Sequence, residues 1–135
     1  MAENITGSGM GSIIVQVYTA DQAVPISDAN VIITRPTQGV EELVRILKTD
    51  RSGRTEAINV PAPPAENSLT PDGGVRYYKY NIRVDYPGYY TMENVNVPVF
   101  EGQKAIQPIF MMPLMEDEER GKVVTVVEEE PFENE

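Results

Sequence analysis

The chain has 135 residues, enough for one compact domain, and a net charge of −10. It contains no cysteine and no histidine, which excludes disulfides, thiolate metal ligands, Ser-His-Asp and Cys-His catalysis, and histidine-bound zinc or iron. Its acidic balance disfavours nucleic acid and anionic membranes, which are bound through clustered lysine and arginine. We therefore expect no catalytic residue, no metal or other cofactor, no nucleic-acid partner and no membrane insertion.

The first predicted elements are strands that follow a leader at residues 1–10. The leader lacks the basic and apolar regions of a secretory signal, and no apolar run is long enough to span a membrane. Ser12–Thr19 alternates apolar and polar side chains, and Asn30–Thr34 carries consecutive β-branched residues. Both patterns are typical of β-strands.

The next segment fits either a helix or a strand. Glu42–Thr49 is too short for its apolar spacing to decide. Because its neighbours are strands, we predict a strand here too. It ends at a turn over Asp50–Gly53, which offers a hydrogen-bonding Asp and a Gly suited to positive φ. Thr55–Val60 then resumes the extended pattern and is predicted to form a hairpin with the preceding strand.

Residues 61–74 form a segment of fourteen residues with four prolines and no apolar period. Such a length is unusual for an ordinary connection. One interpretation is a recognition loop on a rigid scaffold, and the other is an extended connector between two sheets.

The clearest strand signal lies in the second half of the chain. In Val75–Asp85, Tyr78, Tyr80, Ile82 and Val84 share one face, which predicts a half-buried strand. A turn at Pro87–Gly88 precedes a strand within Tyr89–Phe100, whose Val95, Val97 and Val99 are placed in register. Ala105–Leu114 supplies another apolar strand.

The tail holds a short run of high β-propensity between acidic residues: Lys122, Val123, Val124, Thr125, Val126 and Val127. Residues 116–135 carry 9 Asp/Glu against 2 Lys/Arg, so the acidity of the chain is concentrated there. Three interpretations stay open. In the first, the run is an eighth strand of its own sheet. In the second, it is part of a solvated tail, and in the third it pairs with an open edge on a neighbouring molecule.

These elements predict an all-β fold, an antiparallel sandwich of seven to eight strands. We expect three regions: a flexible leader at 1–10, the sandwich at 11–114, and an acidic tail at 115–135 that contains the strand 122–127.

Four pieces of the sequence, in order, resemble the carboxypeptidase regulatory-like domain: Gly11–Val17, Pro25–Val31, Thr49–Arg54 and Gly88–Tyr90. This resemblance spans roughly residues 11–114 and implies a prealbumin-like (transthyretin-like) β-sandwich, a fold that serves as an accessory module in many surface and secreted proteins. Intradiol dioxygenases share the topology and bind iron through His and Tyr, but this chain has no histidine. We therefore expect that the protein is not an enzyme.

A narrower set of segments is similar to small domains of spore-forming anaerobic Firmicutes: Val60–Pro63, Ser68–Pro71, Asn96–Phe100, Gln107–Pro108 and Met112–Leu114. Some of those domains lie beside peptidoglycan-binding or spore cortex-lytic modules. The resemblance implies a spore-associated or surface location. Without a signal peptide, the compartment stays unknown and a cytoplasmic location stays open.

The leading functional hypothesis is a non-enzymatic structural or adhesive subunit of a surface or spore-associated assembly. It would associate with itself, or with another protein of the same assembly, by β-strand addition through Lys122–Val127 or Asn4–Met10. Adding the tail to an open edge gains backbone hydrogen bonds and buries valines, which offsets the cost of ordering it.

The alternative is an accessory module that binds glycan or peptidoglycan. Exposed tyrosines stack on sugar rings, and the predicted surface comprises Tyr77, Tyr89, Tyr90, Asn67 and Asp72.

Overall fold

The computed structural model describes residues 9–64, 77–115 and 123–127. The regular secondary structure of the described residues consists of strands: β1 (Gly9–Thr19), β2 (Asn30–Thr37), β3 (Val40–Lys48), β4 (Ile58–Ala62), β5 (Tyr78–Asp85), β6 (Thr91–Val99), β7 (Lys104–Met111) and β8 (Val123–Val127). The predicted all-β fold with up to eight strands is confirmed. So is the strand interpretation of the segment that begins at Glu42.

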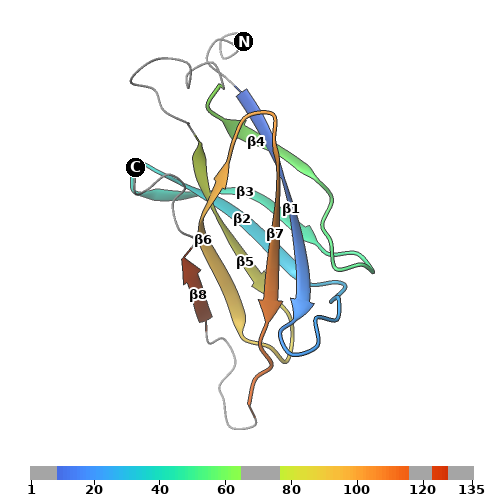
Figure 1. Ribbon diagram of the computed structural model, residues 1–135. Helices are drawn as coiled ribbons and strands as arrows, with labels where there is room; N and C mark the ends of the chain where they lie inside the picture. Colours follow the sequence, from blue (N-terminus) through green and yellow to red (C-terminus); the bar gives the residue numbers. More distant parts are fainter. Residues whose placement is uncertain (1–8, 65–76, 116–122, 128–135) are drawn as a thin grey trace, which may run out of the picture.

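Two sheets make up the sandwich (Figure 1). The smaller sheet has the order β4-β1-β7, and the larger has the order β3-β2-β5-β6-β8. Most neighbours are antiparallel, as predicted, but β1 pairs with β7 and β6 pairs with β8 in parallel. Parallel pairing requires a crossover between the paired strands, which local alternation in the sequence does not reveal.

The core lies between the inward faces of the two sheets. Alternate side chains of each strand point to one face, so these positions lose all contact with solvent: Ile13, Val15 and Val17 of β1, Val31 and Ile33 of β2, and Tyr80, Ile82 and Val84 of β5. The predicted inward face of β5 is therefore confirmed, except that Tyr78 at its start is only half-buried.

The turn over Asp50–Gly53 forms as predicted, but the hairpin after it does not. Asp50 Oδ1 accepts hydrogen bonds from the backbone N–H of Ser52 and of Arg54, which closes the turn. The chain then crosses to the other sheet, where β4 pairs with β1 instead of β3. Hydrogen bonds from Val17 N to Gly53 O (2.7 Å) and from Thr55 N to Val15 O (2.9 Å) fix this crossing.

A β-bulge interrupts β6. The register between β5 and β6 shifts between Tyr80 and Ile82, and Asn96 adopts a φ of 65°. The Asn81 side chain accepts a hydrogen bond from Asn96 N at 3.2 Å. As a consequence Val97 faces the core, whereas Val95 lies beside Val127, so Val95 is not in register with Val97 as the sequence pattern had predicted.

The tail run lies in the chain's own sheet. Val123–Val127 pairs in parallel with β6, from Thr91↔Val123 to Val95↔Val127, and Val124 packs against the core. Lys122 lies outside the described residues. This is the arrangement of the first of the three interpretations, an eighth strand on an edge of the domain.

Candidate functional site

The predicted tyrosine surface is spread over the molecule. Tyr77 precedes β5 and packs on Phe100, with ring centroids 5.3 Å apart. Tyr89 and Tyr90 follow the opposite end of β5, and Tyr90 N donates to Met112 O. Asn67 and Asp72 lie outside the described residues. The structure therefore brings Tyr89 and Tyr90 together but separates them from Tyr77 by the length of a strand.

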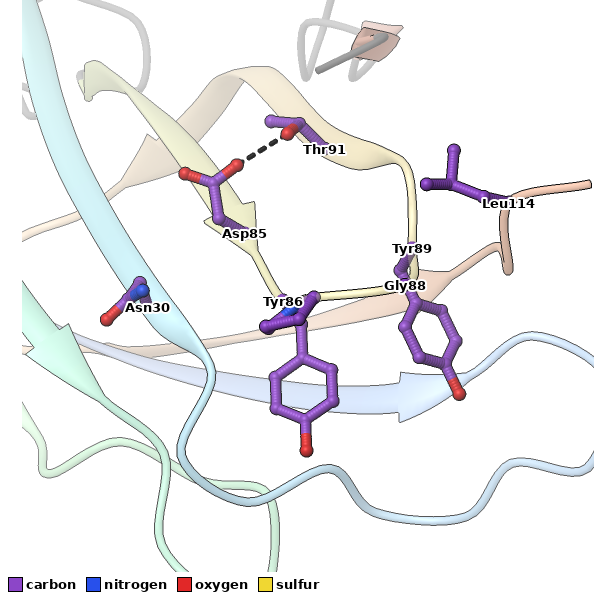
Figure 2. Close-up of a pocket in the computed structure, with 8 residues that line it drawn as sticks. Asn30, Asp85, Tyr86, Gly88, Tyr89, Thr91 and Leu114 are labelled. Atoms are coloured by element: carbon purple, nitrogen blue, oxygen red, sulfur yellow. Dashed lines mark hydrogen bonds between the residues drawn. The ribbon is translucent and has the colours of Figure 1, made fainter. Parts of the chain in front are cut away.

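A small pocket of about 250 Å³ lies beside Tyr89 (Figure 2); its lining is Asn30, Asp85, Tyr86, Pro87, Gly88, Tyr89, Thr91 and Leu114. Thr91 Oγ1 donates a hydrogen bond of 2.5 Å to Asp85 Oδ1. The rings of Tyr86 and Tyr89 point away from this pair in Figure 2 and pack partly against the core. Carboxylate and aromatic rings do not converge on one ligand position here.

A metal centre is not formed by the residues whose positions the structure gives. Over 9–64, 77–115 and 123–127, no three His, Cys, Asp or Glu side chains gather around a common point. The described part of the chain also contains no helix long and apolar enough to cross a membrane.

Large apolar side chains lie on the outer side of the smaller sheet. The parallel register of β1 and β7 places Ile14 beside Ile106, Gln16 beside Pro108, and Tyr18 beside Phe110. We call these six residues the β1–β7 face. Ile106 is 51% exposed and Phe110 is 46% exposed, and the Tyr18 and Phe110 rings stack at 5.6 Å. A row of large apolar side chains therefore meets solvent.

Polar groups border this face on one side. With its oxygen directed at Arg54, the Gln16 amide accepts from Arg54 Nε at 2.6 Å and donates to the Tyr18 hydroxyl at 3.2 Å. Lys104, exposed at the start of β7, lies beside Ser12. The face therefore has apolar side chains at its two ends, Ile14 with Ile106 and Tyr18 with Phe110, and a polar group between them at Gln16. Apolar and polar groups occur side by side in protein-binding surfaces.

The larger sheet is mixed in character. Asn81, Arg83 and Asp85 of β5 alternate with its buried residues, and Arg83 lies opposite Glu93 of β6. Leu43 and Ile46 of β3, each 61% exposed, are apolar, so the polar part of this sheet is the surroundings of Arg83.

The open edge of β7 does not favour a further strand. Gln103 O and Met111 O accept from β1-side N–H groups, at 3.0 Å from Ser12 N and 2.8 Å from Ala20 N. Because the direction of backbone groups alternates along a strand, Pro108 faces the open edge, where it has no N–H to donate. Its carbonyl already accepts from Gln107 Nε2 at 3.1 Å. A partner therefore meets the side chains of β7 more readily than its backbone.

Sequence reasoning missed the β1–β7 face. The signal was present in the alternation of Ser12–Thr19, whose second face includes Ile14 and Tyr18. In Ala105–Leu114 almost every residue is apolar, so the pattern gave no means of separating the core-facing Ile109 from the exposed Phe110.

No family model matches the chain, and no curated protein matches it. Among solved structures, catechol 1,2-dioxygenase from Acinetobacter sp. ADP1 overlays with a TM-score of 0.59 at 13% identity, over 92% of this chain and 60% of that one. The 3-chlorocatechol 1,2-dioxygenase of Rhodococcus opacus 1CP gives 0.50 at 8% identity, over 78% and 61%. Transthyretin from Sparus aurata gives 0.41 at 14% identity, over 74% and 89%.

These likenesses concern the fold alone. The dioxygenases, at TM-scores of 0.59 and 0.50, support the predicted β-sandwich. The chain spans about 60% of the length of the Acinetobacter catechol dioxygenases that it resembles. The comparisons do not support the expected context of spore-forming Firmicutes or a cell wall.

The comparisons also correct the functional hypothesis. The fold neighbours at a TM-score of 0.50 or above named here are catechol dioxygenases, which are enzymes. They overturn the expectation of a non-enzymatic structural or adhesive subunit in a surface or spore assembly, together with its glycan-binding alternative. At 13% identity they do not make this chain an enzyme.

Proposed function

We propose that this sandwich is an interaction domain that docks on another protein through the β1–β7 face. The observation that carries the proposal is the exposure of Ile106 and Phe110, 51% and 46%, beside the stacked ring of Tyr18. Large contiguous apolar surfaces on a folded domain commonly mark interaction sites.

The partner we expect presents an apolar surface with carboxylates at its margin. Its apolar side chains would cover Ile14, Ile106 and Phe110. Its carboxylates would pair with Arg54 and Lys104, the exposed cations beside the face. Charge pairing at the margin would guide encounter, whereas burial of the apolar side chains would supply most of the affinity.

We propose docking, and not catalysis, as the work of this domain. The iron site of intradiol dioxygenases uses histidine, and the chain contains none, so its residues do not fit that metal. The pocket beside Asp85 holds a single carboxylate paired with Thr91, and neither a lysine nor a second carboxylate is among its lining residues. Binding needs none of these groups.

Site-specific photocross-linking in the native host tests the proposal. A benzophenone side chain is introduced at Ile106 on the β1–β7 face, and in a second variant at Arg83 on the larger sheet. We expect one protein adduct from Ile106 and none from Arg83, and the adduct is identified by mass spectrometry. The identified protein is then purified, and its direct binding to the unmodified chain is measured.

Binding between the purified partner and the chain then tests the docking face. A purified partner that binds the chain and loses binding on Ile106→Glu supports the docking face. Adducts from Arg83 alone, or no adduct from either position, contradict it.

A further inference from the structure

A groove separates the edge of β7 from β8, on the open flank of the sandwich. Its volume is about 460 Å³, and its lining is Met92, Asn94, Gln107, Pro108, Ile109, Phe110 and Val126. Met92, Asn94 and Ile109 form the buried part, with 4%, 5% and 1% exposure. Val126 and Phe110 are partly open to solvent, so the groove is deep on one side and accessible on the other.

Asn94 is a polar residue at an inward-facing, buried position of β6. The other inward-facing positions of the strand are apolar: Met92, Val97 and Val99. A buried amide in such a row is more informative than an exposed apolar residue. Asn94 has an interaction within the chain. An asparagine amide offers two donors and an oxygen that accepts twice, so one amide can bond to the chain and to a ligand at the same time.

The β-bulge of β6 lies directly after this residue. Asn96 adopts its positive φ of 65° and donates its N–H to Asn81 Oδ1. The register shift lets Met92 and Asn94 face inward before the break, while Val97 and Val99 do so after it. Bulges commonly redirect side chains next to binding sites, and this one leaves Asn94 at the groove.

We propose that the groove binds a small uncharged molecule with an aromatic or aliphatic body and one amide or hydroxyl group. The walls are apolar, and the polar groups among them are the two neutral amides of Asn94 and Gln107. The volume falls in the range of about 300–1,000 Å³ that is common for small-molecule sites. The ligand's polar group would bond to Asn94, while its body would lie against Met92, Ile109 and Val126.

The neutral lining selects against charged ligands. None of the lining residues carries a charge, so an ion that entered the groove would lose hydration without gaining a counter-charge. The site is separate from the proposed docking function, because Asn94 and Val126 are not part of the β1–β7 face. Phe110 and Pro108 belong to both surfaces.

Solution NMR with three probes tests the proposal on the full chain. Benzamide has a ring and an amide, toluene has the ring alone, and benzoate carries a charge. We expect benzamide to shift the amide signals of Asn94, Ile109 and Val126 in a saturable manner, and benzoate to bind at least tenfold more weakly.

Variants locate the site. Val126→Phe fills the groove from its wall and is expected to weaken benzamide binding at least tenfold. Val127→Phe is the matched control, because Val127 lies next to it on β8 but outside the groove lining. It should leave the affinity unchanged. Asn94→Leu should weaken benzamide about tenfold and leave toluene binding unaltered, which separates loss of the amide from loss of the fold.

Several results would overturn the proposal. Benzoate binding as tightly as benzamide would exclude a neutral site. Equal effects of Val126→Phe and Val127→Phe, or no saturable shift at Asn94, would show that the groove is not where the probe binds. None of these results bears on docking by Ile106, so the two proposals fail independently.

Discussion

At the scale of single residues, Gly53 shows why the motif Thr49–Arg54 is a structural one. Its φ is +79°, and a Cβ placed on it would lie 2.6 Å from Val17 O. The backbone of the turn approaches β1 so closely that Val17 N bonds to Gly53 O. Glycine is thus required twice, for its conformation and for its lack of a side chain.

Gly53→Ala is therefore expected to destabilise the domain by roughly 3 kcal/mol. Gly88→Ala is the matched control, since Gly88 has a φ of +88° but nothing within 4 Å of a Cβ. It should cost about 1 kcal/mol, the conformational term alone. Urea unfolding of both variants measures the difference, and equal losses would show that the contact with β1 is unimportant.

Tyr80 links the two sheets through its hydroxyl. The side chain is fully buried, and its Oη donates a hydrogen bond of 2.6 Å to Pro61 O of the edge strand β4. Burial raises the pKa of Tyr80 from 10.0 to about 12. Its contribution to stability is therefore complete below pH 10 and is lost as the pH rises toward about 12.

Tyr80→Phe should lower the free energy of unfolding by about 2 kcal/mol at neutral pH, because Pro61 O loses its donor. The variant should also lose less stability than the wild type between pH 10 and about 12. Unfolding curves across this range test both effects. An unchanged slope with pH would mean that Tyr80 ionises as readily in the folded chain as in the unfolded one.

At the scale of elements, strands could be predicted from the sequence more readily than their partners. The alternation in Val75–Asp85 is enough to define β5 and its buried face, because a strand with one face in the core needs that period. Pairing depends on where each connection leads. The sequence predicted a hairpin across the turn at Asp50–Gly53. Instead, Thr55 N donates a hydrogen bond to Val15 O of β1, and β4 pairs in the other sheet.

The strand β8 provides a test of pairing within the chain. Truncation after Met115 removes β8 and exposes the edge of β6. The truncation should destabilise the domain by about 1–2 kcal/mol, because Val124 of β8 packs on the core. Truncation after Val127 is the control and should leave stability unchanged. Light scattering measures the oligomeric state of each variant alongside its unfolding curve. If truncation after Met115 abolished oligomers without lowering stability, the pairing of β8 with β6 in its own chain would be contradicted.

At the scale of the whole molecule, we propose different roles for the two outer faces of the sandwich. The side chains around Arg83 are polar, whereas Ile106 and Phe110 of the β1–β7 face are apolar and exposed. The candidate site could not be predicted from the sequence, because Ala105–Leu114 is apolar on both sides of the strand and gives no sign of which side is covered. The groove residue Asn94 was also hidden, since the alternation of Val95, Val97 and Val99 placed it on the outer face of the strand, whereas the bulge at Asn96 leaves both Asn94 and Val97 facing inward.

Docking through the β1–β7 face is tested by the affinity of the purified partner for two variants, one on each outer face of the sandwich. We predict that Ile106→Glu raises Kd at least tenfold, which corresponds to about 1.4 kcal/mol, while Arg83→Glu changes it less than twofold. Both variants should unfold at the wild-type urea concentration, because both side chains are exposed. A Kd unchanged by Ile106→Glu, or raised as much by Arg83→Glu, would contradict the claim that this domain works through its β1–β7 face.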